Sequence, residues 1–315
     1  MFVLAFGSMA AILLSGLLIY RNDLSNASRI PSSAKATLAM LDSARTTEPS
    51  NNCFQLSGDR SEYGGLCRVG NTSPRAIPQF VVWGDSHAQV LIPFFDILSR
   101  SAGVQGVVFF DDGCIPVTGI SLPHYRESCL QKREDALQYI RDKDIKNIFL
   151  VASWSSYVMG GPNQIRGQRI AKPNEISKSP EEAQNTLQKH LMSMVQQLAD
   201  EQRIVYILKQ VPEQSYFDAR RLFYQAIATG KEIQTRGVSS SENATYRAYA
   251  DAAIDSVAKI PGVHAIDPSP ILCEKNSGCP LRRGETLLYR DGNHVSFAGA
   301  MLFEPQFAQI FKTMH

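Results

Sequence analysis

The sequence has no strong excess of charge of either sign. Its 32 lysine and arginine residues nearly balance its 30 aspartate and glutamate residues, for a formal net charge of +2. No block of like charge, internal repeat or low-complexity run interrupts the chain. A near-neutral protein does not attract polyanions strongly, so we expect no nucleic-acid partner. With 44% hydrophobic residues over 315 positions, the chain has ordinary globular composition: one large domain with appendages, or two small ones.

The six cysteines lack the spacing of metal sites. None belongs to a C-x-x-C pair, and no histidine lies near them as a zinc ligand would. Neighbours along the chain form three pairs: Cys53–Cys67, Cys114–Cys129 and Cys273–Cys279. Six cysteines allow fifteen pairings, so this assignment rests on proximity, and six buried free thiols are the alternative. Because disulfides form in oxidising compartments, we expect the body of the protein outside the cytoplasm. We expect no bound metal and no cofactor.

Residues 1–20 contain no charged side chain and are mostly apolar. About 20 apolar residues span a bilayer core, so we predict a transmembrane helix here. A cleaved signal peptide is the alternative, with Ser25-Asn26-Ala27 as a cleavage site. Signal peptides, however, usually carry a basic stretch before a shorter apolar region, and no lysine or arginine precedes this one. Such a helix would make sense as the end of a longer membrane protein.

From residue 79 onward, short apolar segments alternate with longer amphipathic ones. We predict strands over residues 80–84, 104–110, 147–152, 204–210 and 263–266. We predict helices over residues 88–103, 129–143, 180–201, 216–229, 242–259 and 296–311. This alternation is typical of an α/β domain with a mainly parallel sheet covered on both faces. Residues 21–78 precede it as a linker, with a helix near 34–44, and an irregular extension closed by the first cysteine pair.

A candidate nucleophile follows the first strand, in Gly84-Asp85-Ser86-His87. Parallel sheets bind ligands at the carboxyl ends of their strands. A serine between a strand and a helix can present its hydroxyl there, beside backbone N–H groups that face an oxyanion. The alternative for Ser86 is a helix cap.

The matching base is predicted near the C-terminus. Asp291 stands three residues before His294, at the start of a helical pattern. A carboxylate at that spacing can reach the imidazole Nδ1–H and leave Nε2 free to accept the proton of Ser86. Asp267, at a strand end, is the rival orienting acid, and a turn or surface role for Asp291 and His294 is the other alternative.

The order Ser86, Asp291, His294, together with the Gly-Asp-Ser block, resembles the SGNH/GDSL hydrolase superfamily over residues 79–315. The resemblance implies a three-layer αβα domain and a serine-dependent enzyme. It also implies an oxyanion hole completed by a glycine in a second block and an asparagine in a third. We expect the N–H groups of Ser86 and Gly113 to be donors.

The third block departs from that family. Ser153-Trp154-Ser155 stands where Gly-x-Asn-Asp is expected, and Asn163 lies too far along to replace it. One oxyanion donor therefore stays unassigned. Asp85, His87 and Trp154 are candidate substrate contacts, although Asp85 is better suited to holding the loop and His87 to a structural role.

The chain resembles the periplasmic SGNH domain at the C-terminus of bacterial membrane acyltransferases of family 3. Three features carry this resemblance: the altered third block, the membrane segment and the paired cysteines. The resemblance implies an O-acyltransferase, with acetyl as the expected acyl group, anchored in the inner membrane by residues 1–20. Its partners would be an acyl donor, a cell-surface glycan such as lipopolysaccharide O-antigen, and a multi-helix membrane acyltransferase domain, fused or separate. A carbohydrate O-acetyl esterase and a non-catalytic glycan-binding domain are the open alternatives.

Overall fold

The computed structural model of the chain describes residues 31–45, 66–70, 77–122, 127–161, 169–231, 236–274 and 278–314. Two compact units make up the chain: Met1–Ser43 with Asp218–Thr235, and Ala44–Phe217 with Arg236–His315. All predicted site residues belong to the second unit. The predicted membrane segment, residues 1–20, lies outside the described residues. Within the described ranges, no helix has the length and apolarity needed to cross a membrane.

The described residues of the first unit form the helices α2 (Ser32–Arg45) and α10 (Ala219–Thr229). The helix expected near residues 34–44 corresponds to α2. Helix α10 begins three residues later than predicted, because the Asp218 carboxylate accepts the N–H groups of Arg220 and Arg221 and caps it there. Gly230 ends α10 in the left-handed conformation.

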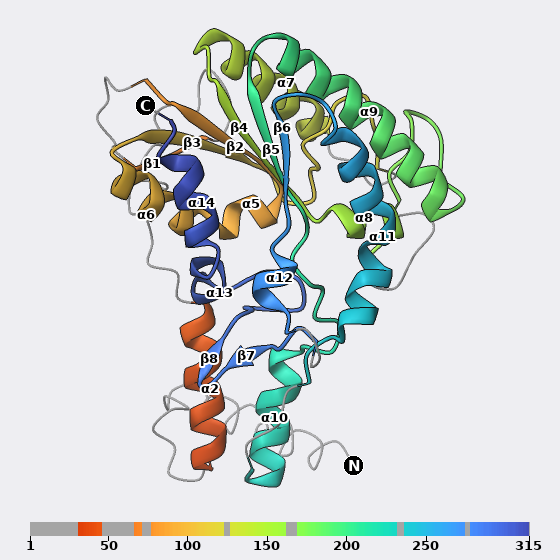
Figure 1. The fold of residues 1–315 in the computed structure, drawn as a ribbon. Helices are drawn as coiled ribbons and strands as arrows, with labels where there is room; N and C mark the ends of the chain where they lie inside the picture. Colours follow the sequence, from red (N-terminus) through yellow and green to blue (C-terminus); the bar gives the residue numbers. More distant parts are fainter. Residues whose placement is uncertain are drawn as a thin grey trace, which may run out of the picture. The chain divides into compact units, whose positions relative to one another are not determined.

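A six-stranded sheet forms the centre of the second unit (Figure 1). Its strands are β1 (Leu66–Gly70), β2 (Phe80–Gly84), β3 (Gln105–Phe110), β4 (Asn147–Val151), β5 (Ile204–Leu208) and β6 (Val263–Ile266). Strands β2 to β6 are parallel, as predicted, whereas β1 runs antiparallel to β3 at one edge. The extension before residue 79 therefore adds a strand to the sheet. The pairing of this strand, β1, with β3 is a long-range contact. The five residues of β1 alone do not predict it.

The strand order is β1-β3-β2-β4-β5-β6. The chain passes from β2 to β3 on one side and then crosses to β4 on the other side of β2. The winding direction thus reverses between β2 and β4, and doubly wound sheets bind ligands beyond the carboxyl ends of strands at such a point. Ser86 follows β2 and Ser153 follows β4, so both lie at this edge.

Helices cover both faces of the sheet (Figure 1). On one face, α7 (Glu127–Asp142), α9 (Pro180–Asp200) and α11 (Ser240–Val257) pack onto a continuous apolar core. On the other, α6 (Ile92–Ala102) and α14 (Glu304–Phe311) contribute to a cluster of phenylalanine rings. Ring centroids in this cluster lie 5.1–6.3 Å apart, and its members are Phe80, Phe94, Phe95, Phe149, Phe303, Phe307 and Phe311. Each buried ring contributes about 1.5–3 kcal/mol.

Two predicted helices are each divided in the structure. The first becomes α5 (Ser86–Val90) and α6, because Pro93 in the first turn of α6 has no N–H to continue the helix. The last becomes α13 (Phe297–Met301) and α14, and Ser296 caps α13 by accepting the N–H of Gly299. The short helices α8 (Trp154–Met159) and α12 (Ser269–Leu272) and the hairpin of β7 (Arg282–Arg283) and β8 (Thr286–Leu287) were not predicted.

Two of the three predicted disulfides lie wholly within the described residues, and both are present. Cys114–Cys129 links the loop after β3 to α7, and Cys273–Cys279 closes the segment after α12. Cys67, in β1, is also disulfide-bonded, while Cys53 lies outside the described residues. Each such bridge contributes about 2–4 kcal/mol, less for the shorter loop.

Candidate active site

Asp85 locks the loop after β2 onto the loop after β4. Its Oδ1 accepts the N–H of His87 at 2.8 Å and caps α5. Its Oδ2 accepts the N–H of Ser153 at 3.0 Å and the hydroxyl of Tyr157 at 2.7 Å. These hydrogen bonds show that Asp85 holds the loop. Because Asp85 is only 1% exposed, it has no surface for a substrate. The prediction that Asp85 contacts the substrate is therefore corrected.

The loop begins at Gly84, where two strands approach closely. A Cβ at this position would lie 1.7 Å from the carbonyl oxygen of Val151. Only glycine fits, so β2 and β4 stay together up to the point where Ser86 leaves the sheet.

Ser86, His294 and Asp291 form one hydrogen-bonded chain. His294 Nε2 lies 2.8 Å from Ser86 Oγ, across 208 sequence positions. On the other side of the ring, His294 Nδ1 lies 2.8 Å from Asp291 Oδ2 and 2.9 Å from Oδ1. The structure therefore brings the three predicted residues together in the predicted order.

The loop itself orients Asp291. Its Oδ1 accepts the backbone N–H groups of Asn293 at 3.1 Å and His294 at 2.8 Å. Burial alone would raise the pKa of Asp291, but the hydrogen bond and charge of His294 and these N–H groups lower it to about 2. An ionised Asp291 holds a proton on Nδ1 of the imidazole and leaves Nε2 as the acceptor facing Ser86.

A buried glutamine outside the predicted site supports this loop. The N–H of Gln214 donates to the carbonyl of Gly292 at 2.6 Å. Its side chain accepts the N–H of Val238 and donates to the carbonyl of Cys279, both at 3.0 Å. Gln214 thereby connects the Asp291 loop to the segment closed by Cys273–Cys279. No local pattern around Gln214 marks this role.

His87 packs against His294. The two ring centroids are 4.8 Å apart, and His87 is buried. Burial lowers the pKa of His87 to about 4 and outweighs the opposing charge of Asp85. His87 is therefore neutral at physiological pH and forms a wall against which the His294 ring is oriented.

A sequence model of the family described as "SGNH domain (fused to AT3 domains)" matches residues 52–309. The chain belongs to this family. Among solved structures, the chain is similar to the periplasmic domain of the Salmonella ser. Paratyphi A lipopolysaccharide acetyltransferase, with 16% identity, a TM-score of 0.54, and coverage of 75% of this chain and 84% of that one. At this identity the likeness shows the fold.

A second similar structure is a GDSL-like lipase from Bacteroides thetaiotaomicron, at 12% identity and a TM-score of 0.40, covering 90% of this chain and 100% of that one. No curated protein sequence matches the chain. The family match begins before β1, in agreement with the place of β1 in the sheet of the SGNH domain.

The two predicted oxyanion donors lie at neighbouring strand ends of the SGNH domain. The N–H of Ser86 opens α5, and Gly113 lies in the turn after β3, where Asp111 donates its N–H to the carbonyl of Gly84. Gly113 has a φ of 73°, and no atom would crowd a Cβ there. Within the described part of the chain, neither N–H donates a hydrogen bond, so both are free to face an oxyanion.

The third block has a structural role in this domain. Trp154 is fully buried in α8 and donates its indole N–H to the carbonyl of Leu208 at 2.8 Å, which corrects its place among the substrate contacts. Ser153 Oγ donates to Ser156 Oγ at 2.7 Å, and Ser156 Oγ lies 3.1 Å from the hydroxyl of Tyr246 in α11. A row of hydroxyl groups thus occupies the edge beside Ser86.

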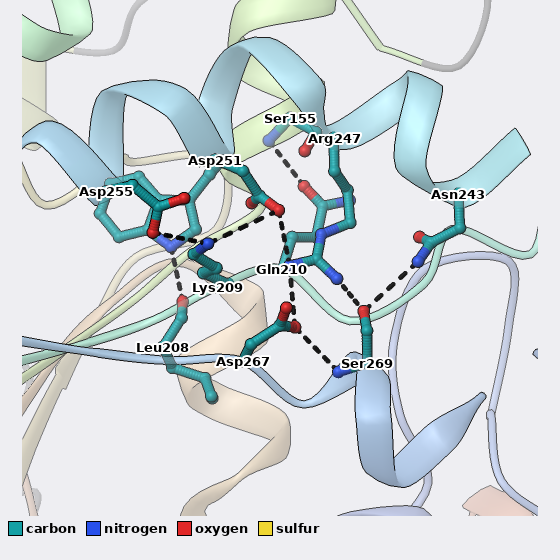
Figure 2. Close-up of polar contacts among 11 residues, drawn as sticks. Ser155, Leu208, Lys209, Gln210, Asn243, Arg247, Asp251, Asp255, Asp267 and Ser269 are labelled. Atoms are coloured by element: carbon teal, nitrogen blue, oxygen red, sulfur yellow. Dashed lines mark hydrogen bonds and ion pairs between the residues drawn. The ribbon is translucent and has the colours of Figure 1, made fainter. Parts of the chain in front are cut away.

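Asp267, the rival orienting acid, is bound by other partners. Figure 2 shows its carboxylate bound to Arg247, at 2.9 Å, and to the N–H of Ser269, also at 2.9 Å. It makes no contact with His294, because β6 lies three strands from β2. Asp291 is therefore the acid paired with the histidine.

Glu213, after β5, is a carboxyl group that no sequence motif marked. It is 6% exposed and accepts a hydrogen bond from the Gln210 amide at 3.0 Å. Burial, together with the charge of Asp291, raises the pKa of Glu213 to about 7. A carboxyl group that is about half protonated at neutral pH thus stands beside the Asp291 loop.

One cluster of potential metal ligands occurs in the described ranges: Asp111, Cys114 and Cys129. The two sulfurs are joined in a disulfide, so they do not act as thiolate ligands.

Proposed function

We propose that this SGNH domain is a serine-dependent O-acyltransferase that transfers an acyl group, acetyl in the simplest case, to hydroxyls of a cell-surface glycan such as lipopolysaccharide O-antigen. The Ser86–His294–Asp291 chain, at the edge where the winding of the sheet reverses, carries this proposal. Membership of a family fused to AT3 domains supports transfer, and the fold shared with the periplasmic domain of a lipopolysaccharide acetyltransferase supports a glycan acceptor.

In the first half-reaction, His294 Nε2 takes the proton of Ser86 while Oγ attacks the carbonyl carbon of the acyl donor. The negative oxygen of the tetrahedral intermediate accepts hydrogen bonds from the N–H groups of Ser86 and Gly113. The donor's leaving group departs with the proton from His294, and an acyl-serine ester is left at Ser86. Asp291 stabilises the transient imidazolium of His294 throughout.

In the second half-reaction, a glycan hydroxyl gives its proton to His294 and attacks the acyl-serine carbonyl. The Ser86 ester bond breaks, Oγ recovers the proton from His294, and the glycan leaves as an ester. An esterase with the same triad would use water at this step. A mass balance separates the two: an esterase releases free acid and yields no acylated glycan.

The proposed setting is the periplasm, with the chain anchored by residues 1–20 and working with a multi-helix membrane acyltransferase domain. Disulfides at Cys114–Cys129 and Cys273–Cys279 fit an oxidising compartment. We propose a linking extension at 21–78 and a catalytic domain at 79–315, with β1 of the extension completing the sheet.

The decisive experiment replaces Ser86 by alanine in cells that carry the complete acylation system. We expect O-acylation of the surface glycan, followed by mass spectrometry, to be lost, because no acyl-enzyme forms. Ser101→Ala, at an exposed position of α6, is the matched control and should leave acylation intact. Unchanged glycan acylation in Ser86→Ala would refute the proposal.

A further inference from the structure

A recess opens between α11 and α12, at the edge of the sheet where Ser86 lies. Its volume of about 610 Å³ falls within the range of small-molecule sites. We call it the α11–α12 recess, and its principal lining residues are Asn243, Ala244, Arg247, Asp251, Asp267 and Ser269. Figure 2 shows the polar side chains of this region.

The floor of the recess is held rigidly by Arg247. This residue is 2% exposed, and its Nη2 lies 2.9 Å from both Asp251 Oδ2 and Asp267 Oδ1. Its Nη1 donates to the hydroxyl of Ser269, whose N–H in turn donates to Asp267. Polar groups fixed in this way lose little entropy when they bind a ligand.

Hydrogen bonding in the recess is incomplete. Asn243 is 5% exposed and donates its amide N–H to Ser269 Oγ at 3.3 Å, yet its Oδ1 has no hydrogen-bond partner in the described ranges. Arg247 Nε and Asp251 Oδ1 are likewise unpartnered there. Since buried polar atoms in native proteins almost always have partners, three such atoms at one recess point to a polar ligand.

The charge of the lining restricts the ligand class. Arg247 contributes one positive charge, against three negative charges from Asp251, Asp267 and Glu274, for a net charge of −2. Phosphates and uronic acids are therefore repelled. Hydroxyl groups both donate and accept hydrogen bonds, so a neutral sugar suits a lining of carboxylate and amide groups.

The recess also lies within reach of Ser86 along the sheet edge. Asp267 follows β6, and three strand spacings separate β6 from β2. At about 4.8 Å per spacing, the ends of β2 and β6 lie about 14 Å apart. Tyr246 of α11 contacts Ser156 of α8, which follows β4, so the helix that lines the recess extends toward the triad.

We propose that the α11–α12 recess is a subsite for a neutral sugar residue of the acceptor glycan, a few residues along the polymer from the hydroxyl that receives the acyl group. This inference rests on the proposed function, because acyl transfer at Ser86 makes the ligand a glycan. Long acceptor fragments then bind more tightly than short ones, since only long fragments occupy both the α11–α12 recess and the site at Ser86.

The test measures binding by calorimetry to the full chain carrying Ser86→Ala, which prevents turnover. The probes are deacylated, neutral O-antigen oligosaccharides of one and of several repeat units. Ala244→Tyr, at an exposed lining position of α11, fills the recess without removing a hydrogen bond, and Asn243→Ala removes one polar group. Ala248→Tyr, also exposed on α11 but outside the lining, is the matched control. Thermal unfolding verifies that each variant is folded.

We expect both recess variants to bind the long oligosaccharide about tenfold more weakly or worse, with the control unchanged. Equal affinity for long and short probes, absent binding of both, or wild-type affinity in Ala244→Tyr would overturn the subsite. Acyl-enzyme formation at an intact Ser86 is assayed separately. Oligosaccharide binding at the recess without any acyl-enzyme would refute the proposed function and leave the subsite in place.

Discussion

The triad and the α11–α12 recess both place an aspartate at the carboxyl edge of one sheet, but the two aspartates have different partners. Asp291 has a side chain 43% exposed and pairs with His294, whose Nε2 faces the hydroxyl of Ser86. Asp267 pairs with the buried guanidinium of Arg247. Position at the edge thus does not decide the chemistry of an aspartate; the partner does.

The largest effect expected from this difference is on catalysis. Asp291→Asn should slow acyl-enzyme formation by about 10⁴-fold at neutral pH, because an amide allows the wrong tautomer of His294. Stopped-flow kinetics with an activated ester measures the rate. Asp255→Asn, an exposed aspartate of α11, is the control, with a rate within about twofold of wild type because surface charges contribute little. An equal loss of rate in a folded Asp267→Asn variant would contradict the distinction between the two aspartates. It would make Asp267 the orienting acid again.

The next effect is on stability, and it belongs to the recess. Arg247→Met leaves Asp267 without its cation and leaves Asp251 only Lys209, 3.9 Å away, so it should lower the free energy of unfolding by about 3–5 kcal/mol. Urea denaturation measures this loss. Arg236→Met, which removes an exposed cation paired with Glu242 at 3.7 Å, should cost less than about 1 kcal/mol. A similar cost for both variants would show that the buried pairing contributes nothing special.

The smallest effect concerns Glu213, which stands between the two regions. Its folded-state pKa is raised to about 7, above the ordinary value of 4.5, so the folded protein binds this proton more tightly than the unfolded chain. The carboxyl group therefore costs stability progressively as pH rises from 4.5 to about 7. Glu213→Gln should raise the free energy of unfolding by about 3 kcal/mol at pH 8 and hardly change it at pH 4.

Denaturation of both proteins across this pH range measures the difference. Glu175→Gln, at an exposed position, is the control and should give parallel curves for variant and wild type. A constant offset between Glu213→Gln and wild type at every pH would assign the effect to packing and contradict the ionisation of a buried carboxyl group.

Much of the architecture follows from local patterns. The run of apolar residues in β2 predicts a buried strand, and Ser179 and Ser296 predict helix starts, because strand burial and capping depend on near neighbours. The division at Pro93 and the strand β1 were missed. Pairing of β1 with β3 joins residues some forty positions apart, which no short window contains.

By itself, the sequence determined the pieces that act over a few residues: the sharp exit of Ser86 from β2 and the pairing of Asp291 with His294, since a carboxylate three residues before a histidine reaches its ring directly. Only the tertiary structure decided which pieces meet. It brought His294 to Ser86 across 208 positions, buried Asp85 and Trp154, and paired Asp267 with Arg247. These contacts depend on the order in which strands join the sheet, and that order is a property of the whole chain.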